Sequence, residues 1–335
     1  VLRKDVEDGM AKEQHLAWGI SSMQGWREHM EDAHFAVASL ADLSPGGDQG
    51  AGYNWNGSSV FGVLDGHGGE HVARFCQRHL PMALAGTNGA ADVGACLVEA
   101  FETMDALLED PNNREELSSF SAKPAPVIGV GCAAPDADPD TQGCTANVCC
   151  IRKDSITVAN AGDSRSVLCR GGRAIELSQD HKPGLPGEWN RITRAGGFVE
   201  GDRVNGDLAT SRAIGDLEYK QDRNLPRSLQ VLSVTPDVGI LARSPSDEFI
   251  ILACDGVWDV LSSQEAVDFV RREIGPREEV ERRVLAGDLK LSAVTSRMLD
   301  FCIGPSKGSR DNMTAILVVF TEVVPAFAPS PQKPW

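Results

Sequence analysis

The sequence has no long hydrophobic run and no basic block. Its longest apolar runs, residues 249–254 and 315–320, are far shorter than the ~20 residues that a membrane-spanning helix needs. Acidic residues outnumber basic ones by 48 to 32, and Lys and Arg are scattered along the chain. The sequence therefore predicts no transmembrane segment, and nucleic acid and anionic membranes are poor candidates for partners. An excess of carboxylates suits a cation instead.

The cysteines also lack the spacing of a metal or redox site. There are nine, an odd number, and no two of them form a Cys-x-x-Cys pair. Reduced, mostly buried thiols explain this pattern better than disulfides or a zinc site. We therefore expect an intracellular protein, in the cytoplasm or nucleus. Because the chain begins with Val1 and not with Met, the sequence leaves open whether the protein has an N-terminal signal or an acylated N-terminus.

The most informative stretch is residues 60–69, an apolar run too short for a helix that leads into Asp65, Gly66 and His67. It predicts a buried strand that ends in a functional turn. A carboxylate survives burial only beside a positive partner, and glycines allow backbone carbonyls to approach that partner closely. A metal ion is the simplest such partner.

The rest of the chain alternates between strand and helix patterns. Further strands are predicted at 16–23, 33–40, 145–151, 156–161, 165–169, 174–177, 230–236, 248–254 and 313–320. Helical spacing predicts helices around 72–80, 93–108, 188–195, 262–274 and 292–302. The fourth begins with a capping box formed by Ser262 and Glu265.

We expect one large domain over residues 16–322, preceded by an N-terminal extension over 1–15 and followed by a disordered Pro-rich tail over 323–335. Stretches 44–58 and 111–142 lack periodicity and predict inserted loops. The second loop imitates a dinucleotide fingerprint and a calcium loop, but neither imitation has the flanking residues that the motif requires.

Acidic residues recur where apolar strands end, although almost the whole chain separates the first from the last. They are Glu31, Asp32, Asp65, Asp163, Asp255 and Asp311. Convergence at one site is the natural explanation. Several carboxylates with no sulfur and little imidazole favour hard divalent ions such as Mg²⁺ or Mn²⁺ over zinc.

At this point the sequence resembles a known family, protein phosphatase 2C. The motifs that carry the resemblance keep their order along residues 18–320: Gly25-Trp-Arg-x-x-Met-Glu-Asp-Ala-His34, Phe61-Gly-Val-Leu-Asp-Gly-His-Gly-Gly69, Gly143-Cys-Thr-Ala146, Ala161-Gly-Asp-Ser-Arg165, Asp180-His-Lys-Pro183, Ser211-Arg-Ala-Ile-Gly-Asp216, Cys254-Asp-Gly-Val-Trp-Asp259 and Arg310-Asp-Asn-Met-Thr314. The resemblance implies an α+β fold, an α-β-β-α sandwich in which two antiparallel sheets, flanked by pairs of helices, hold a binuclear metal site at one edge.

The resemblance also implies a role for each site residue. Two Mn²⁺ or Mg²⁺ ions would be held by Asp65, the carbonyl of Gly66, Asp255 and Asp311, with Glu31 and Asp32 acting mainly through metal-bound waters. Asp163, together with Asp255, matches the site of a third and weaker metal. Arg27 resembles the residue that binds the substrate phosphate, and His67 resembles the general acid. By the same resemblance, residues 183–227 are expected to include the family's mobile flap beside the site.

The activity implied is metal-dependent hydrolysis of phosphoserine and phosphothreonine in proteins. A metal-bridging water would attack in line, without a covalent intermediate, and phosphoproteins would be the partners of a monomer. A cysteine phosphatase is excluded, because no cysteine is followed by the arginine of a Cys-x₅-Arg loop. The alternative is a catalytically silent phosphatase fold that acts as a binding or scaffold protein, which the intact acids argue against.

Overall fold

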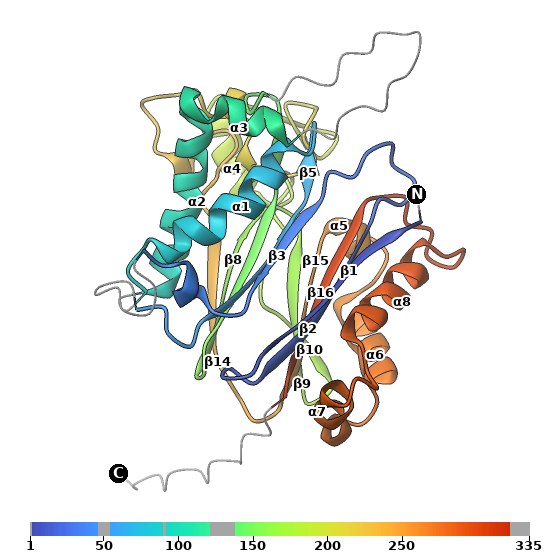
Figure 1. The fold of residues 1–335 in the computed structure, drawn as a ribbon. Coiled ribbons are helices and arrows are strands. Elements are labelled where there is room, and N and C mark those ends of the chain that lie inside the picture. The colour runs from blue at the N-terminus through green and yellow to red at the C-terminus, as the bar shows by residue number, and fades with distance from the viewer. Residues whose placement is uncertain (1, 46–53, 90–91, 121–137, 322–335) are drawn as a thin grey trace, which may run out of the picture.

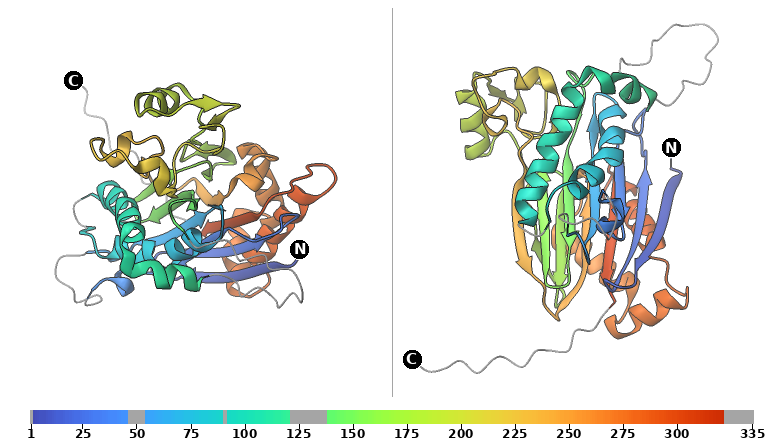
Figure 2. Two further views of the ribbon diagram at one scale, coloured as in Figure 1. Left: turned by 90° about the horizontal axis from the view of Figure 1, so that it is seen from above. Right: turned by 60° about the vertical axis from the view of Figure 1, so that its left-hand side comes forward.

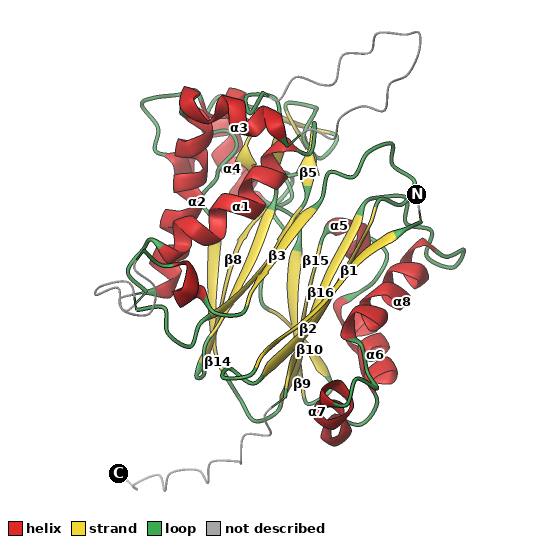
Figure 3. Ribbon diagram, viewed as in Figure 1, coloured by secondary structure: helices red, strands yellow, loops and turns green. Residues whose placement is uncertain are grey.

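The computed structural model describes residues 2–45, 54–89, 92–120 and 138–321. Two large antiparallel sheets lie face to face, and helices cover the outer face of each (Figures 1 and 3). From left to right in Figure 1, the layers run helix, sheet, sheet, helix. The predicted α-β-β-α sandwich is confirmed.

The larger sheet has six strands in the order β1-β2-β16-β15-β9-β10. Their bounds are β1 Lys4–Ala11, β2 Leu16–Met23, β16 Met313–Phe320, β15 Asp247–Ala253, β9 Arg165–Arg170 and β10 Arg173–Glu176. The strand nearest the C-terminus therefore lies inside the sheet, between β2 and β15.

The second sheet has five strands in the order β14-β8-β7-β4-β3. Their bounds are β14 Asp237–Ala242, β8 Ser155–Ala161, β7 Ala146–Ile151, β4 Ser59–Leu64 and β3 Ala33–Val37. A small sheet of three short strands extends it, in the order β13 (Ile214–Gly215), β6 (Gly143–Cys144) and β5 (Gly66–His67). Strands β11 Val199–Glu200 and β12 Arg203–Val204 form a separate pair.

In the part of the chain that the structure describes, two long helices pack on each large sheet. Helices α1 (His71–Ala85) and α2 (Val93–Glu109) contact the five-stranded sheet, and α6 (Ser263–Ile274) and α8 (Leu291–Ile303) contact the six-stranded one. The remaining helices are short: α3 Arg114–Ser119, α4 Pro186–Arg194, α5 Asp255–Trp258, α7 Arg277–Leu285, and the 3₁₀ turns η1 Leu40–Leu43, η3 Pro111–Asn113, η4 Leu217–Lys220 and η5 Arg227–Leu229.

Side-chain alternation along the strands explains the layers. In β16, Ala315 and Leu317 pack with the α6–α8 layer, whereas Ile316 and Val318 pack between the sheets. All eight residues of this strand are buried. A strand that is covered on both faces needs apolar residues at every position, which is why the central strands read as continuous hydrophobic runs.

One predicted strand is wrong. Residues 230–236 form no strand; Ser233 makes only an isolated bridge to Arg212, and β14 begins at Asp237. Side chains occupy the backbone of this run instead: Arg191 donates to the Gln230 carbonyl and Arg212 to the Thr235 carbonyl, both at 3.1 Å. Pro236 at its end has no N–H to donate to a sheet ladder. The strand expected over 33–40 also ends early, at Val37.

Strand β1 and helix α7 were not predicted, because neither segment has an apolar pattern. Strand β1 falls inside the segment for which we expected an N-terminal extension, and it pairs with β2 along its whole length. It is an edge strand with mostly exposed side chains, so it carries no hydrophobic alternation. Helix α7 buries only Val280 and is otherwise rich in Arg and Glu. The domain boundaries stay a prediction.

Parts of the predicted loops and the tail lie outside the described residues. Within loop 111–142, residues 111–119 form η3 and α3, and the two imitation motifs fall mainly outside the described residues. The cysteines that the structure describes are free and buried. Among the described residues, no helix has the length and apolar character needed to cross a membrane.

The segment with α4, β11 and β12 projects from the sandwich as a lobe (Figure 2) and is fastened through Glu188. This side chain is 8% exposed and accepts hydrogen bonds from Arg191, from Arg212 at 2.7 Å and from the Ser211 hydroxyl at 2.6 Å. Arg212 also donates to Asp237 of β14 at 2.7 Å. Burial alone would raise the pKa of the Glu188 carboxyl, but Arg212 and Arg191 outweigh burial and lower it to about 2.

We expect replacement of Glu188 by Gln to remove pH-dependent stability. Because its folded pKa lies below the usual value, the Glu188 contribution is complete above pH 4.5 and is lost as the pH falls toward about 2. A shift of this size corresponds to roughly 3 kcal/mol. Urea unfolding at pH 7 should show Glu188→Gln destabilised by up to that amount, with a smaller gap at pH 3. Glu278→Gln, at an exposed position of α7, is the control. A gap that does not change with pH would contradict the assignment.

Candidate metal centre

The centre is organised around Asp65, which follows the fully buried strand β4 and precedes β5. The Asp65 carbonyl accepts a hydrogen bond from the Thr145 N–H at 2.8 Å, which fixes the strand end. Gly66 permits a close approach of the Glu31 backbone, because a Cβ at Gly66 would lie 2.3 Å from the Glu31 carbonyl oxygen. A side chain at this position would separate Glu31 and Asp32 from Asp65.

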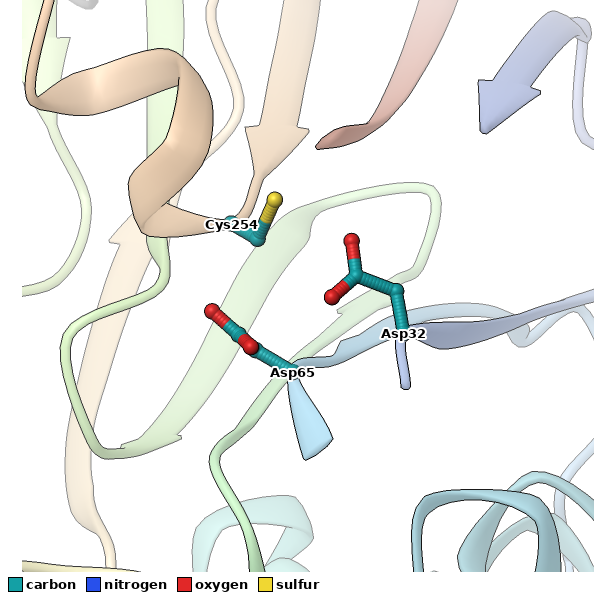
Figure 4. A group of neighbouring side chains, drawn as sticks. All are labelled: Asp32, Asp65 and Cys254. Atoms are coloured by element: carbon teal, nitrogen blue, oxygen red, sulfur yellow. The ribbon is translucent and has the colours of Figure 1, made fainter. Parts of the chain in front are cut away.

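Asp32, Asp65 and Cys254 point toward one another from three different segments (Figure 4). One carboxylate oxygen of each Asp and the Cys254 sulfur lie within 4.8 Å of one another. Asp32 Oδ2 accepts a hydrogen bond from the Thr314 hydroxyl at 2.8 Å, but Asp32 Oδ1 is buried and has no hydrogen-bond partner. A buried carboxylate oxygen without a donor is costly, and an ion or an ion-bound water is the kind of partner it lacks.

The pKa values of the clustered carboxyl groups also favour a bound cation. Burial, and then the charges of Asp32 and Asp255, raise the pKa of Asp65 well above its usual value. Burial also raises the pKa of Asp32 to about 6, and burial together with Asp163 raises that of Asp255 to about 7. The protein's own cations therefore do not neutralise these carboxylates. An oxygen-rich donor set with excess negative charge fits Mg²⁺ or Mn²⁺.

Asp311 and Arg27 meet on one side of the centre. Arg27 donates to Asp311 Oδ2 at 2.7 Å, while its side chain stays 60% exposed. Burial by itself would lower the pKa of Arg27, but Asp311 raises it. The guanidinium is thus held charged at the entrance of the site, with donors left for an incoming anion.

Asn312, which the sequence analysis did not place in the site, fixes the loop that carries Arg27. Its side-chain N–H groups donate to the carbonyls of Gln24 at 2.8 Å and His29 at 2.9 Å, and its Oδ1 accepts from the Glu31 N–H at 2.8 Å. The signal in the sequence was the position of this asparagine, directly after the predicted metal ligand Asp311.

His67 is held by Asp216, a second residue that the sequence analysis left without a role. The two side chains share a 2.7 Å hydrogen bond across β6, the strand between them in the small sheet. Gly143 of β6 makes room for this bond, since a Cβ there would lie 2.1 Å from Asp216 Oδ2 and 2.7 Å from His67 Nε2. Burial would lower the pKa of His67, but the Asp216 carboxylate raises it.

Asp163 lies in the turn before β9, and the structure gives it a cation. Lys182 donates to Asp163 Oδ2 at 2.6 Å. Lys182, to which the sequence gave us no reason to assign a role, is therefore the partner of this carboxylate in the structure, and the third-metal role of Asp163 stays a prediction. Glu31 lines the same pocket as Asp163, and burial raises the pKa of the Glu31 carboxyl.

These side chains line a pocket of about 590 Å³. The predicted site residues that line it are Arg27, Glu31, Asp65, Gly66, His67, Asp163, Asp255 and Asp311. Asp32 is the exception: it is buried and does not line the pocket. The lobe contributes a wall from Arg203 and residues 207–210, which lie inside the segment that we expected to contain a flap.

Comparison with known proteins agrees with the geometry. The sequence model of the family described as Protein phosphatase 2C matches residues 16–313. "Probable protein phosphatase 2C 11" from Oryza sativa subsp. japonica is 38% identical over 349 aligned positions, which cover 96% of this chain and 89% of that protein. "Protein phosphatase 2C homolog 2" from Aspergillus fumigatus is 41% identical, and the match covers 90% of this chain and 64% of that one.

Solved structures show the same fold. The crystal structure of a phosphatase from a pathogenic strain of Toxoplasma gondii has a TM-score of 0.67 at 24% identity, and the match covers 95% of this chain and 96% of that one. At that identity the likeness supports the fold alone. The family match covers residues 16–313, well over half of the chain, and the match to the rice protein covers 96% of the chain, so the chain belongs to the protein phosphatase 2C family.

Proposed function

We propose that this chain hydrolyses phosphoserine and phosphothreonine in proteins with the help of bound Mn²⁺ or Mg²⁺. The observation that carries the proposal is the meeting of buried, mutually repelling carboxylates around Asp65 in a pocket that also presents Arg27 and His67. Free buried cysteines suit a compartment that keeps thiols reduced, such as the cytoplasm or nucleus.

Two ions would be held by the side chains of Asp65, Asp255 and Asp311 and by the Gly66 carbonyl, with Glu31 and Asp32 acting mainly through waters. A third, weaker ion would use Asp163 and Asp255. When bound, the ions would neutralise the phosphate dianion and would lower the pKa of a water for in-line attack. The protein's own share is to hold these carboxylates together in a buried place.

Arg27 and His67 would act on the substrate itself. Arg27, already oriented by Asp311, offers its remaining N–H groups to the phosphate oxygens, a task that suits a planar guanidinium. His67 would protonate the departing Ser or Thr oxygen. Because its Nε2 is engaged with Asp216, proton transfer falls to Nδ1, and the Asp216 carboxylate stabilises the charged ring.

We expect Asp65→Asn to abolish hydrolysis of p-nitrophenyl phosphate at any Mn²⁺ concentration. The variant should also lose the metal-induced rise in melting temperature that the wild type shows, because an ion that binds only the folded state stabilises it. In EDTA at pH 7.5 the order should reverse, with the variant melting higher, since a carboxyl whose folded pKa is raised destabilises the fold above its unfolded pKa.

Asp288→Asn, at an exposed position outside the pocket, is the matched control and should behave as the wild type in both measurements. An unchanged Mn²⁺-induced shift in Asp65→Asn would contradict the metal assignment.

We expect Asp163→Ala to keep a near-native melting temperature but to lower turnover strongly and to raise the Mn²⁺ concentration that half-maximal activity requires. Lys182→Met serves as the comparison, because it removes the lysine that now pairs with Asp163 and leaves the carboxylate in place. That variant should not need more metal than the wild type. If Asp163→Ala unfolds, or keeps full activity at low metal, Asp163 is a turn residue only.

We expect Gly143→Ala to displace Asp216 from His67, because the new methyl group occupies the space of their hydrogen bond. Phosphoserine-peptide turnover should fall by roughly 10² or more, the usual contribution of general acid catalysis. Turnover of p-nitrophenyl phosphate should change little, since p-nitrophenolate leaves without a proton. Gly187→Ala, where an added Cβ meets nothing within 4 Å, is the control. Equal losses on both substrates would argue against His67 as the acid.

A further inference from the structure

Asp105 is a charged residue in the middle of α2 that is wholly buried and does not line the pocket. Its Oδ1 accepts a hydrogen bond from the Gly215 N–H at 2.9 Å, and its Oδ2 accepts one from Lys220 Nζ at 2.7 Å. Lys220 is also buried, with its side chain 3% exposed, and it donates a second bond to the Ala213 carbonyl at 2.8 Å. One carboxylate thus holds the segment both before and after Asp216.

The held segment has an unusual backbone. Gly215 has a φ of 83° and Asp216 a φ of 48°, so two successive residues occupy the left-handed region. For a residue with a side chain this costs about 1 kcal/mol or more, and the conformation persists only where surrounding contacts fix it. The Asp216 N–H donates to the Gln142 carbonyl at 2.8 Å, and Asp105 supplies the contacts on either side.

Arg227 also lies 3.6 Å from Asp105 Oδ2, and it forms a further ion pair with Glu109. Stability alone is a weak explanation for the buried ion pair of Asp105 with Lys220. A buried pair loses about as much through desolvation as it gains through attraction, and replacing both partners by apolar residues is often neutral. What the pair does supply is orientation, since its bonds end on the residue before Asp216 and on the turn after it. Asp216 in turn is the partner of His67 at 2.7 Å.

We propose that Asp105 is a positioning residue for the reaction, which by accepting the Gly215 N–H fixes the left-handed turn at Asp216 and so the orientation of the His67 ring. The inference rests on the proposed function, in which His67 protonates the leaving oxygen. It makes the face of α2 that packs on the small sheet part of the catalytic architecture, although this helix does not touch the pocket.

The test compares two double variants that both remove the charge pair. Asp105→Leu/Lys220→Met leaves the Gly215 N–H without an acceptor, whereas Asp105→Asn/Lys220→Met keeps an amide oxygen for it. The turnover numbers for a phosphoserine peptide, whose alkoxide needs a proton, and for p-nitrophenyl phosphate, which needs none, are measured with saturating Mn²⁺. Arg170→Met/Asp247→Leu is the matched control, because Asp247 is also a buried carboxylate that binds an arginine at 2.6 Å and a backbone N–H at 2.7 Å.

We expect the Leu/Met variant to lose about 10-fold or more in peptide turnover, with little change in KM and little change on p-nitrophenyl phosphate. The Asn/Met variant should keep the wild-type ratio of the two substrates, and so should the control. Adding Asp216→Asn to the Leu/Met variant should cause little further loss, because both changes act on the same hydrogen bond.

Equal losses on both substrates, or equal behaviour of the Leu/Met and Asn/Met variants, would overturn the inference. If the Leu/Met variant does not fold, Asp105→Glu decides: it keeps the charge pair but moves the acceptor by one methylene, so positioning requires a loss on the peptide alone. An unchanged ratio in that variant would overturn the inference too. Failure of the wild type to hydrolyse the peptide would instead refute the proposed function.

Discussion

Repulsion among buried carboxylates is the constraint on which the arrangement of this molecule depends. Asp65 follows a strand of one sheet, and Asp255 and Asp311 flank strands of the other, so the acids meet only because the two sheets pack face to face. Burial first, and then the neighbouring carboxylates, raise the pKa of Asp65 and of Asp255, so folding must work against both the desolvation and the mutual repulsion of these groups. The apolar layer between the sheets, which contributes nothing to the chemistry, supplies the opposing free energy.

Close backbone contacts extend this control to the surroundings of the acids. A side chain at Gly66 would collide with the Glu31 backbone, and one at Gly143 would collide with the hydrogen bond between His67 and Asp216. Asn312 fixes the loop that carries Arg27. The groups that would touch the substrate are thus each supported from behind: Arg27 by Asp311, and His67 by Asp216. Catalysis that depends on the precise placement of reacting groups requires such rigid support, because a small displacement of a reacting group lowers the rate strongly.

Much of this could be predicted from the sequence, and the limits have physical causes. The central strands were found because burial on both faces leaves uninterrupted apolar runs, as in Met313–Phe320, and the acids were found because they follow such runs. Strand β1 was not predicted, because an exposed edge strand carries no hydrophobic pattern. The ion pair of Lys182 with Asp163 was not predicted, because the two residues are 19 positions apart and a charged residue in a turn or loop usually faces solvent.

The position of β16 has a consequence for synthesis. This strand lies between β2 and β15, and Asp311 and Asn312 come immediately before it. During translation the chain emerges from its N-terminal side, so the six-stranded sheet stays open until residues 313–320 have left the ribosome. Arg27, Asp65 and Asp255 are all made earlier, yet none of them has its complete surroundings before that moment. The centre is therefore assembled late, and an unfinished chain does not contain it.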